Sequence, residues 1–415
     1  MKAATSAAPS RRKGVIWNAL GTSMFAANTL IMLIVVSRTS SVATVGCFGI
    51  ALAVAQLLYN IGIFGVNLFQ MTDYQEQYAF FNYLHTRIFT CLLMMLVCAV
   101  IVIWIMPEPE KKLLTFLLTL FFLTHAFGDL FQSLFFQQNR LDLSGQALFF
   151  RSLLALLAFT AVQVLVRDTA FALVATILAS IISVVAWGVL RARPWFSGRS
   201  GINRGRIAEV LRSCLPLFVS SFLVVFIFNA ARYGIDWLLD DTAQGYFSLI
   251  VLPVFVINLV SQFIFMPVLN DFSRALKAGD RHRFFHLLTR QSFLVALITA
   301  VIAAAMPPLG VPLLTLLYAV DLSGFSLEAA LLIVGGGLFA LNQLFYSVLV
   351  TMRRQTSILL AYGVGVVFAV LVAVALIASR GLFGACLALV LSQVPVLLLF
   401  IGAVTRGLSV KRGKV

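Results

Sequence analysis

Residues 215–239, LPLFVSSFLVVFIFNAARYGIDWLL, form an apolar run that is long enough to cross a bilayer as an α-helix. Four polar residues recur in it at helical spacing and therefore share one face of that helix: Asn229, Arg232, Tyr233 and Asp236. Charged side chains are costly in hydrocarbon and usually face a bundle interior or a wet cavity. The run predicts a transmembrane helix with a candidate binding face. The alternatives are a structural ion pair or an arginine that reaches the membrane interface.

Composition places the whole chain in the same class. It is 61% hydrophobic and only 11% charged, with a mean hydropathy of +1.02, which excludes an ordinary soluble domain. The net charge of +15 lies in short segments between apolar runs, as the positive-inside rule expects, and not in a nucleic-acid-binding face. The five cysteines lie in or beside apolar runs without CxxC spacing, so we interpret them as packing residues: Cys47, Cys91, Cys98, Cys214 and Cys386.

Apolar runs of sufficient length predict twelve transmembrane spans. They cover approximately 14–36, 45–66, 83–106, 113–136, 146–166, 170–190, 215–239, 244–269, 291–312, 328–350, 356–378 and 382–404. The first run is too long for the core of a signal peptide, so we expect a retained helix. Most lysines and arginines then fall on one side, which predicts cytoplasmic termini.

The spans group into two halves. We expect a cytoplasmic tail over 1–13, a first lobe over 14–190, a basic cytoplasmic linker over 191–214, a second lobe over 215–404 and a basic cytoplasmic tail over 405–415. The segment 44–50, TVGCFGI, resembles 243–249, AQGYFSL, at the start of the second span of each half. The predicted fold is therefore an all-α polytopic membrane protein with two six-helix lobes related by pseudo-two-fold symmetry.

Further polar residues lie inside the other spans. Asn18 is in the first span, Gln56 and Asn60 are one helical turn apart in the second, and Arg38, Arg87 and Arg151 lie near span ends. His125 and Asp129 are one turn apart in the fourth span. A histidine beside a carboxylate can relay protons or bind a cation. The alternative is a hydrogen-bonded pair that joins neighbouring helices.

Several motifs are missing from the sequence. It has no phosphate-binding Gly-x-x-x-x-Gly-Lys-Ser/Thr loop, no metal-ligand spacing, no Gly-x-Ser-x-Gly and no long loop with catalytic side chains. We therefore expect neither an enzyme nor a bound metal or organic cofactor.

Short segments along the chain resemble bacterial polysaccharide-biosynthesis membrane proteins, the O-antigen (Wzx-type) flippases of the multidrug/oligosaccharidyl-lipid/polysaccharide (MOP) exporter superfamily. In the first half these are 17–22 (WNALGT), 36–38 (VSR), 46–53 (GCFGIALA), 60–66 (NIGIFGV) and 83–88 (YLHTRI). In the second half they are 232–236 (RYGID), 245–248 (GYFS) and 265–267 (FMP).

The resemblance implies two lobes around a central cavity and alternating access. Such a protein carries an undecaprenyl-diphosphate-linked oligosaccharide, as in lipopolysaccharide synthesis, between leaflets of the bacterial cytoplasmic membrane. Arginine suits the diphosphate, and the candidates are Arg38, Arg87, Arg151 and Arg232. Amides, hydroxyls and a carboxylate suit the sugars, and the candidates are Asn18, Gln56, Asn60, Asn229, Tyr233 and Asp236. His125 and Asp129 are candidates for coupling to a proton or sodium gradient. Partners implied are membrane lipids, the polysaccharide polymerase and glycosyltransferases.

Three other functions stay open at this point. They are a cation-coupled multidrug exporter of the same fold, a flippase for the peptidoglycan precursor, and a membrane enzyme of polysaccharide synthesis.

Overall fold

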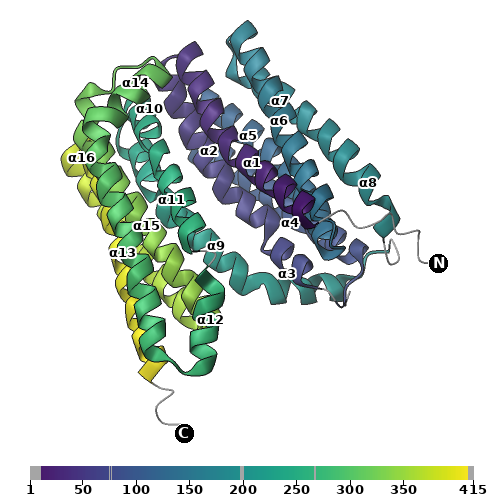
Figure 1. The fold of residues 1–415 in the computed structure, drawn as a ribbon. Coiled ribbons are helices and arrows are strands. Elements are labelled where there is room, and N and C mark those ends of the chain that lie inside the picture. Colours follow the sequence, from purple (N-terminus) through teal and green to yellow (C-terminus); the bar gives the residue numbers. More distant parts are fainter. Residues whose placement is uncertain (1–10, 74, 76, 197–200, 266–267, 410–415) are drawn as a thin grey trace. The chain divides into compact units, whose positions relative to one another are not determined.

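The computed structural model describes residues 11–73, 75, 77–196, 201–265 and 268–409 (Figure 1). These residues form helices and connecting turns, with no β-strand among them, so the predicted all-α class is confirmed. The chain divides into two compact units, Met1–Phe222 and Leu223–Val415, and the division falls inside one long helix, α9 (Arg204–Leu238).

The first unit holds the helices that precede this division. They are α1 (Arg11–Thr39), α2 (Val42–Ile63), α3 (Val66–Thr72), α4 (Phe80–Val100), η1 (Ile101–Ile105), α5 (Pro109–Gln137), α6 (Leu141–Val166), α7 (Thr169–Ser183), η2 (Val184–Val189), α8 (Leu190–Ala192), η3 (Arg193–Trp195) and the first part of α9.

The second unit holds the rest of α9 and the helices that follow it. They are α10 (Asp241–Ile250), α11 (Leu252–Phe265), α12 (Leu269–Ala278), α13 (Arg281–Ala305), η5 (Met306–Gly310), α14 (Val311–Tyr318), η6 (Ser323–Phe325), α15 (Ser326–Thr351) and α16 (Gln355–Ser409).

The helices agree with the predicted number of spans. Among the described residues, 10 helices are long and apolar enough to cross a membrane. One of them, α16, is kinked at Gly381, whose φ of 57° and ψ of −134° are not helical, so the predicted spans 356–378 and 382–404 meet there. The predicted span 244–269 corresponds to α10 and α11 in succession. The protein is thus a multi-pass membrane protein.

The segment expected as a linker, 191–214, contains more helix than the sequence reading assigned. It includes η3 and the first turns of α9, which begins at Arg204. Val210 and Cys214 are fully buried in an aromatic cluster of the first unit. The apolar-run criterion misses these turns because helical hydrogen bonding continues beyond the stretch that lipid would cover.

Both units begin their second helix with the same kind of cap. The side chain of Ser41 accepts a hydrogen bond from the Thr44 backbone N–H at 3.2 Å, at the start of α2. The side chain of Asp240 accepts one from the Ala243 N–H at 2.7 Å, at the start of α10. Such caps satisfy N–H groups that the first helical turn leaves without partners. The repeated sequence motif therefore starts three residues after an N-cap in each unit, at the residue whose N–H bonds to the cap.

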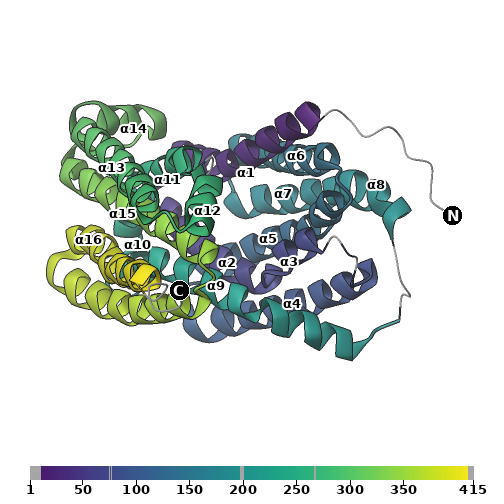
Figure 2. The same cartoon turned by 60° about the horizontal axis from the view of Figure 1, so that its bottom comes forward.

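In the first unit α1 lies beside α6 (Figures 1 and 2). Glycines permit the close approach: a Cβ on Gly21 would lie 2.7 Å from the Gly145 carbonyl oxygen, and one on Gly145 would collide with the Trp17 backbone. Small residues at such crossings let transmembrane helices pack backbone to backbone.

Candidate functional site

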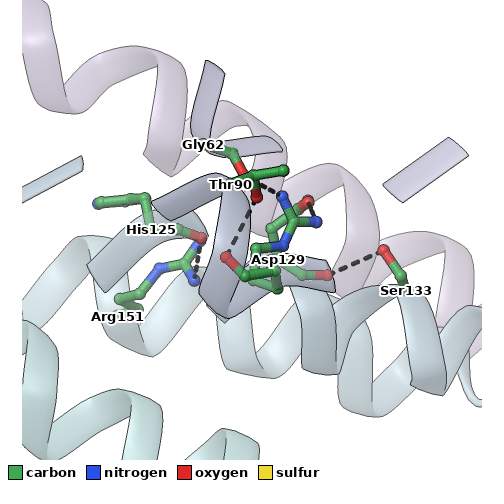
Figure 3. Close-up of polar contacts among 7 residues, drawn as sticks. Gly62, Thr90, His125, Asp129, Ser133 and Arg151 are labelled. Carbon is green, nitrogen blue, oxygen red and sulfur yellow. Dashed lines mark hydrogen bonds and ion pairs between the residues drawn. The ribbon is translucent and has the colours of Figure 1, made fainter. Parts of the chain in front are cut away.

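The first unit contains a buried cluster of ionisable side chains drawn from three helices. It consists of Arg87 on α4, His125 and Asp129 on α5, and Arg151 on α6. Figure 3 shows His125, Asp129 and Arg151 within this cluster. The sequence predicted all four as site residues, and packing of the helices brings them together.

Arg87 is fully buried, and its guanidinium group makes two polar contacts. Its Nη2 forms an ion pair with the Asp129 carboxylate at 3.3 Å, and its Nη1 donates a hydrogen bond to the Gly62 carbonyl oxygen at 2.8 Å. The hydroxyl of Thr90 donates to the same carbonyl at 2.7 Å. A buried charge needs both a counter-ion and hydrogen bonds, and Arg87 has both.

Arg151 is 3% exposed, and its contacts are weaker than those of Arg87. Its Nη1 lies 3.5 Å from the His125 carbonyl oxygen (Figure 3). Its guanidinium lies against Gly128, where a Cβ would collide with it. It also interacts electrostatically with Asp129 and with Tyr59 of α2. The cluster thus contains two guanidinium groups and one carboxylate, which leaves an excess of positive charge if Asp129 is ionised.

The His125 ring lies among aromatic side chains. Its centroid is 4.6 Å from that of Phe121, 5.2 Å from that of Phe25 on α1, and 6.1 Å from that of Phe122. Neither ring nitrogen has a hydrogen-bond partner among the described residues. The Asp129 carboxylate therefore bonds to Arg87 and not to His125, although the two residues are one turn apart on α5.

In the second unit the polar face of α9 contains another buried arginine. Arg232 is 4% exposed, and its Nη1 donates to the Asn229 side-chain oxygen at 3.1 Å. Asn229 in turn donates from Nδ2 to the Val225 carbonyl at 3.0 Å. Tyr233 and Asp236 are half-buried on the same helix. Asn229 and Arg232, which the sequence spacing places on one helical face, are thus in direct contact.

The other predicted ligands lie on α1 and α2. Asn18 is half-buried, and its backbone carbonyl accepts from the Thr22 hydroxyl at 2.9 Å. The side chain of Asn60 donates to the Gln56 carbonyl at 2.9 Å, within α2. Arg38 is exposed in the last turn of α1. The hydrogen bonds described for Asn18, Gln56 and Asn60 stay within their own helices.

Sequence reasoning missed the residues that shape the first cluster. They are Tyr59, Gly62, Thr90 and Gly128. The glycine at 128, directly before a membrane-embedded aspartate, was a usable signal, because glycine in a helix often marks a close approach. Thr90 gave no such signal, since hydroxyls within transmembrane helices commonly bond to their own backbone.

The fold matches solved membrane transporters over nearly the whole chain. An inward-facing multidrug resistance MATE family transporter of the MOP superfamily aligns with a TM-score of 0.68 at 13% identity, covering 97% of this chain and 100% of that one. The lipid II flippase MurJ, in an inward closed conformation, aligns with a TM-score of 0.75 at 11% identity, covering 94% and 87%. The eukaryotic MATE transporter AtDTX14 aligns with a TM-score of 0.64 at 13% identity, covering 95% and 96%. No curated protein sequence matches the chain.

The arrangement of the helices therefore matches the fold of MOP superfamily transporters. A family model described as polysaccharide biosynthesis protein matches residues 12–272. The chain belongs to this polysaccharide biosynthesis family, as the sequence resemblance predicted.

Proposed function

We propose that this protein is a flippase that moves an undecaprenyl-diphosphate-linked oligosaccharide, such as an O-antigen repeat unit of lipopolysaccharide, from the inner to the outer leaflet of the bacterial cytoplasmic membrane. The observation that carries the proposal is the family match over residues 12–272, which joins a MOP fold to polysaccharide biosynthesis. Both termini are cytoplasmic in this proposal, and the protein is a transporter with no catalytic residues.

Arg232 is the residue on which substrate binding depends most in this proposal. Its described hydrogen bond is to a neutral amide, that of Asn229, so this bond does not neutralise the guanidinium charge. A diphosphate supplies anionic oxygens that match the planar donors of arginine, and such bonds are stronger in a poorly hydrated site. The half-buried Tyr233 and Asp236 offer hydrogen bonds to sugar hydroxyls.

The remaining predicted ligands fall into two groups. Arg151, with one weak hydrogen bond, and Arg38 are further candidates for the diphosphate, and Asn18, Gln56 and Asn60 are candidates for sugars. Arg87 is not in this set, because Asp129 and the Gly62 carbonyl already engage its guanidinium. His125 and Asp129 are the proposed coupling groups for a proton or sodium gradient. Polymerase and glycosyltransferases are the proposed partners.

The test uses the purified protein in liposomes that contain a labelled polyprenyl-diphosphate oligosaccharide. We expect transfer between leaflets with the wild type, a loss of about 10- to 100-fold with Arg232→Ala, as for a lost charge-assisted hydrogen bond, and a smaller loss with Arg232→Lys. Arg290→Ala is the control, because Arg290 is an exposed arginine on α13. Transport by Arg232→Ala at the wild-type rate would remove Arg232 from the site.

Because of the structural matches, the same assay also tests two alternative substrates. Lipid II is included because the match to a lipid II flippase has a TM-score of 0.75, and a fluorescent cationic drug is included because MATE transporters share the fold. Transfer of only the drug, or of only lipid II, would replace the proposed substrate.

A further inference from the structure

The second helix of the first unit is broken at Phe64 and Gly65. Both residues have left-handed backbones, with φ of 47° and 69°, and α3 starts directly after them at Val66. Phenylalanine rarely adopts this conformation, which is strained and requires support from its surroundings. In the last turn of α2 the Asn60 carbonyl still accepts from the Phe64 N–H at 2.9 Å, but the other carbonyls that a continuous helix would pair need partners from elsewhere.

Two side chains of α4 satisfy one of these carbonyls. Arg87 Nη1 lies 2.8 Å and the Thr90 hydroxyl 2.7 Å from the Gly62 oxygen. Gly62 allows this approach, since a Cβ there would lie 2.8 Å from the Met94 sulfur of α4. Arg87 thus caps the broken end of α2 from a neighbouring helix.

Helix α5 holds both sides of the break. Asp129 fixes the Arg87 guanidinium at 3.3 Å, and the side chain of Asn67, in the first turn of α3, also lies beside this carboxylate. Further along α5, the Gln137 side chain donates to the backbone carbonyl of Asp73, directly after α3, at 2.7 Å. Helix α3 is therefore tied to α5 at its beginning and at its end.

Helix α9 packs against the break. The Phe64 ring stacks on that of Phe218, with centroids 4.2 Å apart and planes 12° apart. A Cβ on Gly65 would lie 3.0 Å from the Cβ of Leu217. Arg232 lies further along the same helix.

We propose that Arg87 is a positioning residue for transport. It holds the α2–α3 break in the geometry against which α9 packs. It does not bind the substrate. The consequence for transport depends on the proposed function, whereas the consequence for the break does not.

The structural part of the test needs no substrate. Spin labels are placed at Leu68 on α3 and Leu215 on α9, which are 54% and 47% exposed, in a background without native cysteines. The variants are Thr90→Val, Gly65→Ala and the charge-neutral double variant Arg87→Gln/Asp129→Asn. We expect a single narrow distance distribution in the parent and a broadened or shifted one in all three. Arg140→Gln is the matched control, because its ion pair with Asp142, at 3.0 Å in the same unit, does not involve α2.

The transport part separates positioning from binding. We expect the three variants to lower turnover about tenfold, a middle value for mutations that alter coupling, with an unchanged KM, while Arg232→Ala raises KM. Combining Gly65→Ala with the double variant should add little, because both disturb the same break. An unchanged distance distribution in the double variant, or a raised KM, would overturn the proposal. If no lipid-linked sugar is moved by the wild type, the proposed function fails while the distance measurement still decides the role of Arg87.

Discussion

Among the described residues of the first unit, Asp129 is the carboxylate that lies beside two buried guanidinium groups. Arg87 lies 3.3 Å away as its ion-pair partner, and Arg151 interacts with it electrostatically. In a site of low dielectric constant such a pair adds little net stability, but losing one partner leaves an uncompensated charge. The intact pair therefore contributes little to stability while the loss of one partner costs much. At the scale of single residues, this difference makes the role of Asp129 measurable.

We expect Asp129→Asn to lower the free energy of unfolding by about 3–5 kcal/mol, because Arg87 would stay charged and buried without its carboxylate. Arg87→Gln in the Asp129→Asn background should recover part of this loss, since no unpaired charge remains. Thermal unfolding of the purified variants in one detergent measures both effects. A double variant that is less stable than either single variant would contradict the ion-pair account.

At the scale of elements, the contact between α1 and α6 depends on glycines. A side chain at Gly145 would meet the Trp17 backbone, and one at Gly21 would meet the Gly145 carbonyl. Without these glycines the two helices would have to separate. That separation would also disturb the aromatic contact between Phe25 on α1 and His125.

Gly145→Ala should therefore destabilise the protein by about 1–3 kcal/mol, the usual cost of overpacking a well-packed contact. Gly363→Ala on α16 is the control, because a Cβ there meets nothing within 4 Å. Alanine also favours helix over glycine by about 1 kcal/mol, so the control should be neutral or stabilising. Thermal unfolding compares the two, and equal stability would show that α1 and α6 can separate freely.

At the scale of the whole molecule, the twelve spans set the membrane topology. An even number of spans would place both termini on one side, and the positive-inside rule predicts that this side is the cytoplasm. The kink at Gly381 is decisive, because a straight α16 would remove one crossing and leave the C-terminus outside.

Single cysteines can test this topology. Introduced at Glu110 and Arg380, which are both exposed, they should react with a membrane-impermeant maleimide in intact cells. A cysteine at the exposed Arg283 of α13 should react only after permeabilisation. Protection of the Arg380 position in intact cells would mean that the kink at Gly381 does not face the outside and that the span count is wrong.

The sequence by itself determined the membrane class, the family, the span count and the polar face of α9. These follow from local properties, because apolar runs define spans and residues one helical turn apart share a face whatever surrounds them. For this reason the spacing of Asn229 and Arg232 could place both on one face of α9, where the structure has them in contact. The Gly381 kink lay where two apolar runs meet, so the division of α16 was predictable as well.

Only the tertiary structure decided which groups pair between helices. His125 and Asp129 are one helical turn apart in the sequence. Because α4 packs beside α5, Asp129 pairs with Arg87, and the His125 ring lies among phenylalanines. The break at Phe64 and Gly65 was also hidden, because an apolar run has the same composition whether its helix is continuous or broken. What supports the break is a set of side chains from α4, α5 and α9, and their meeting depends on packing between distant segments, which no local pattern encodes.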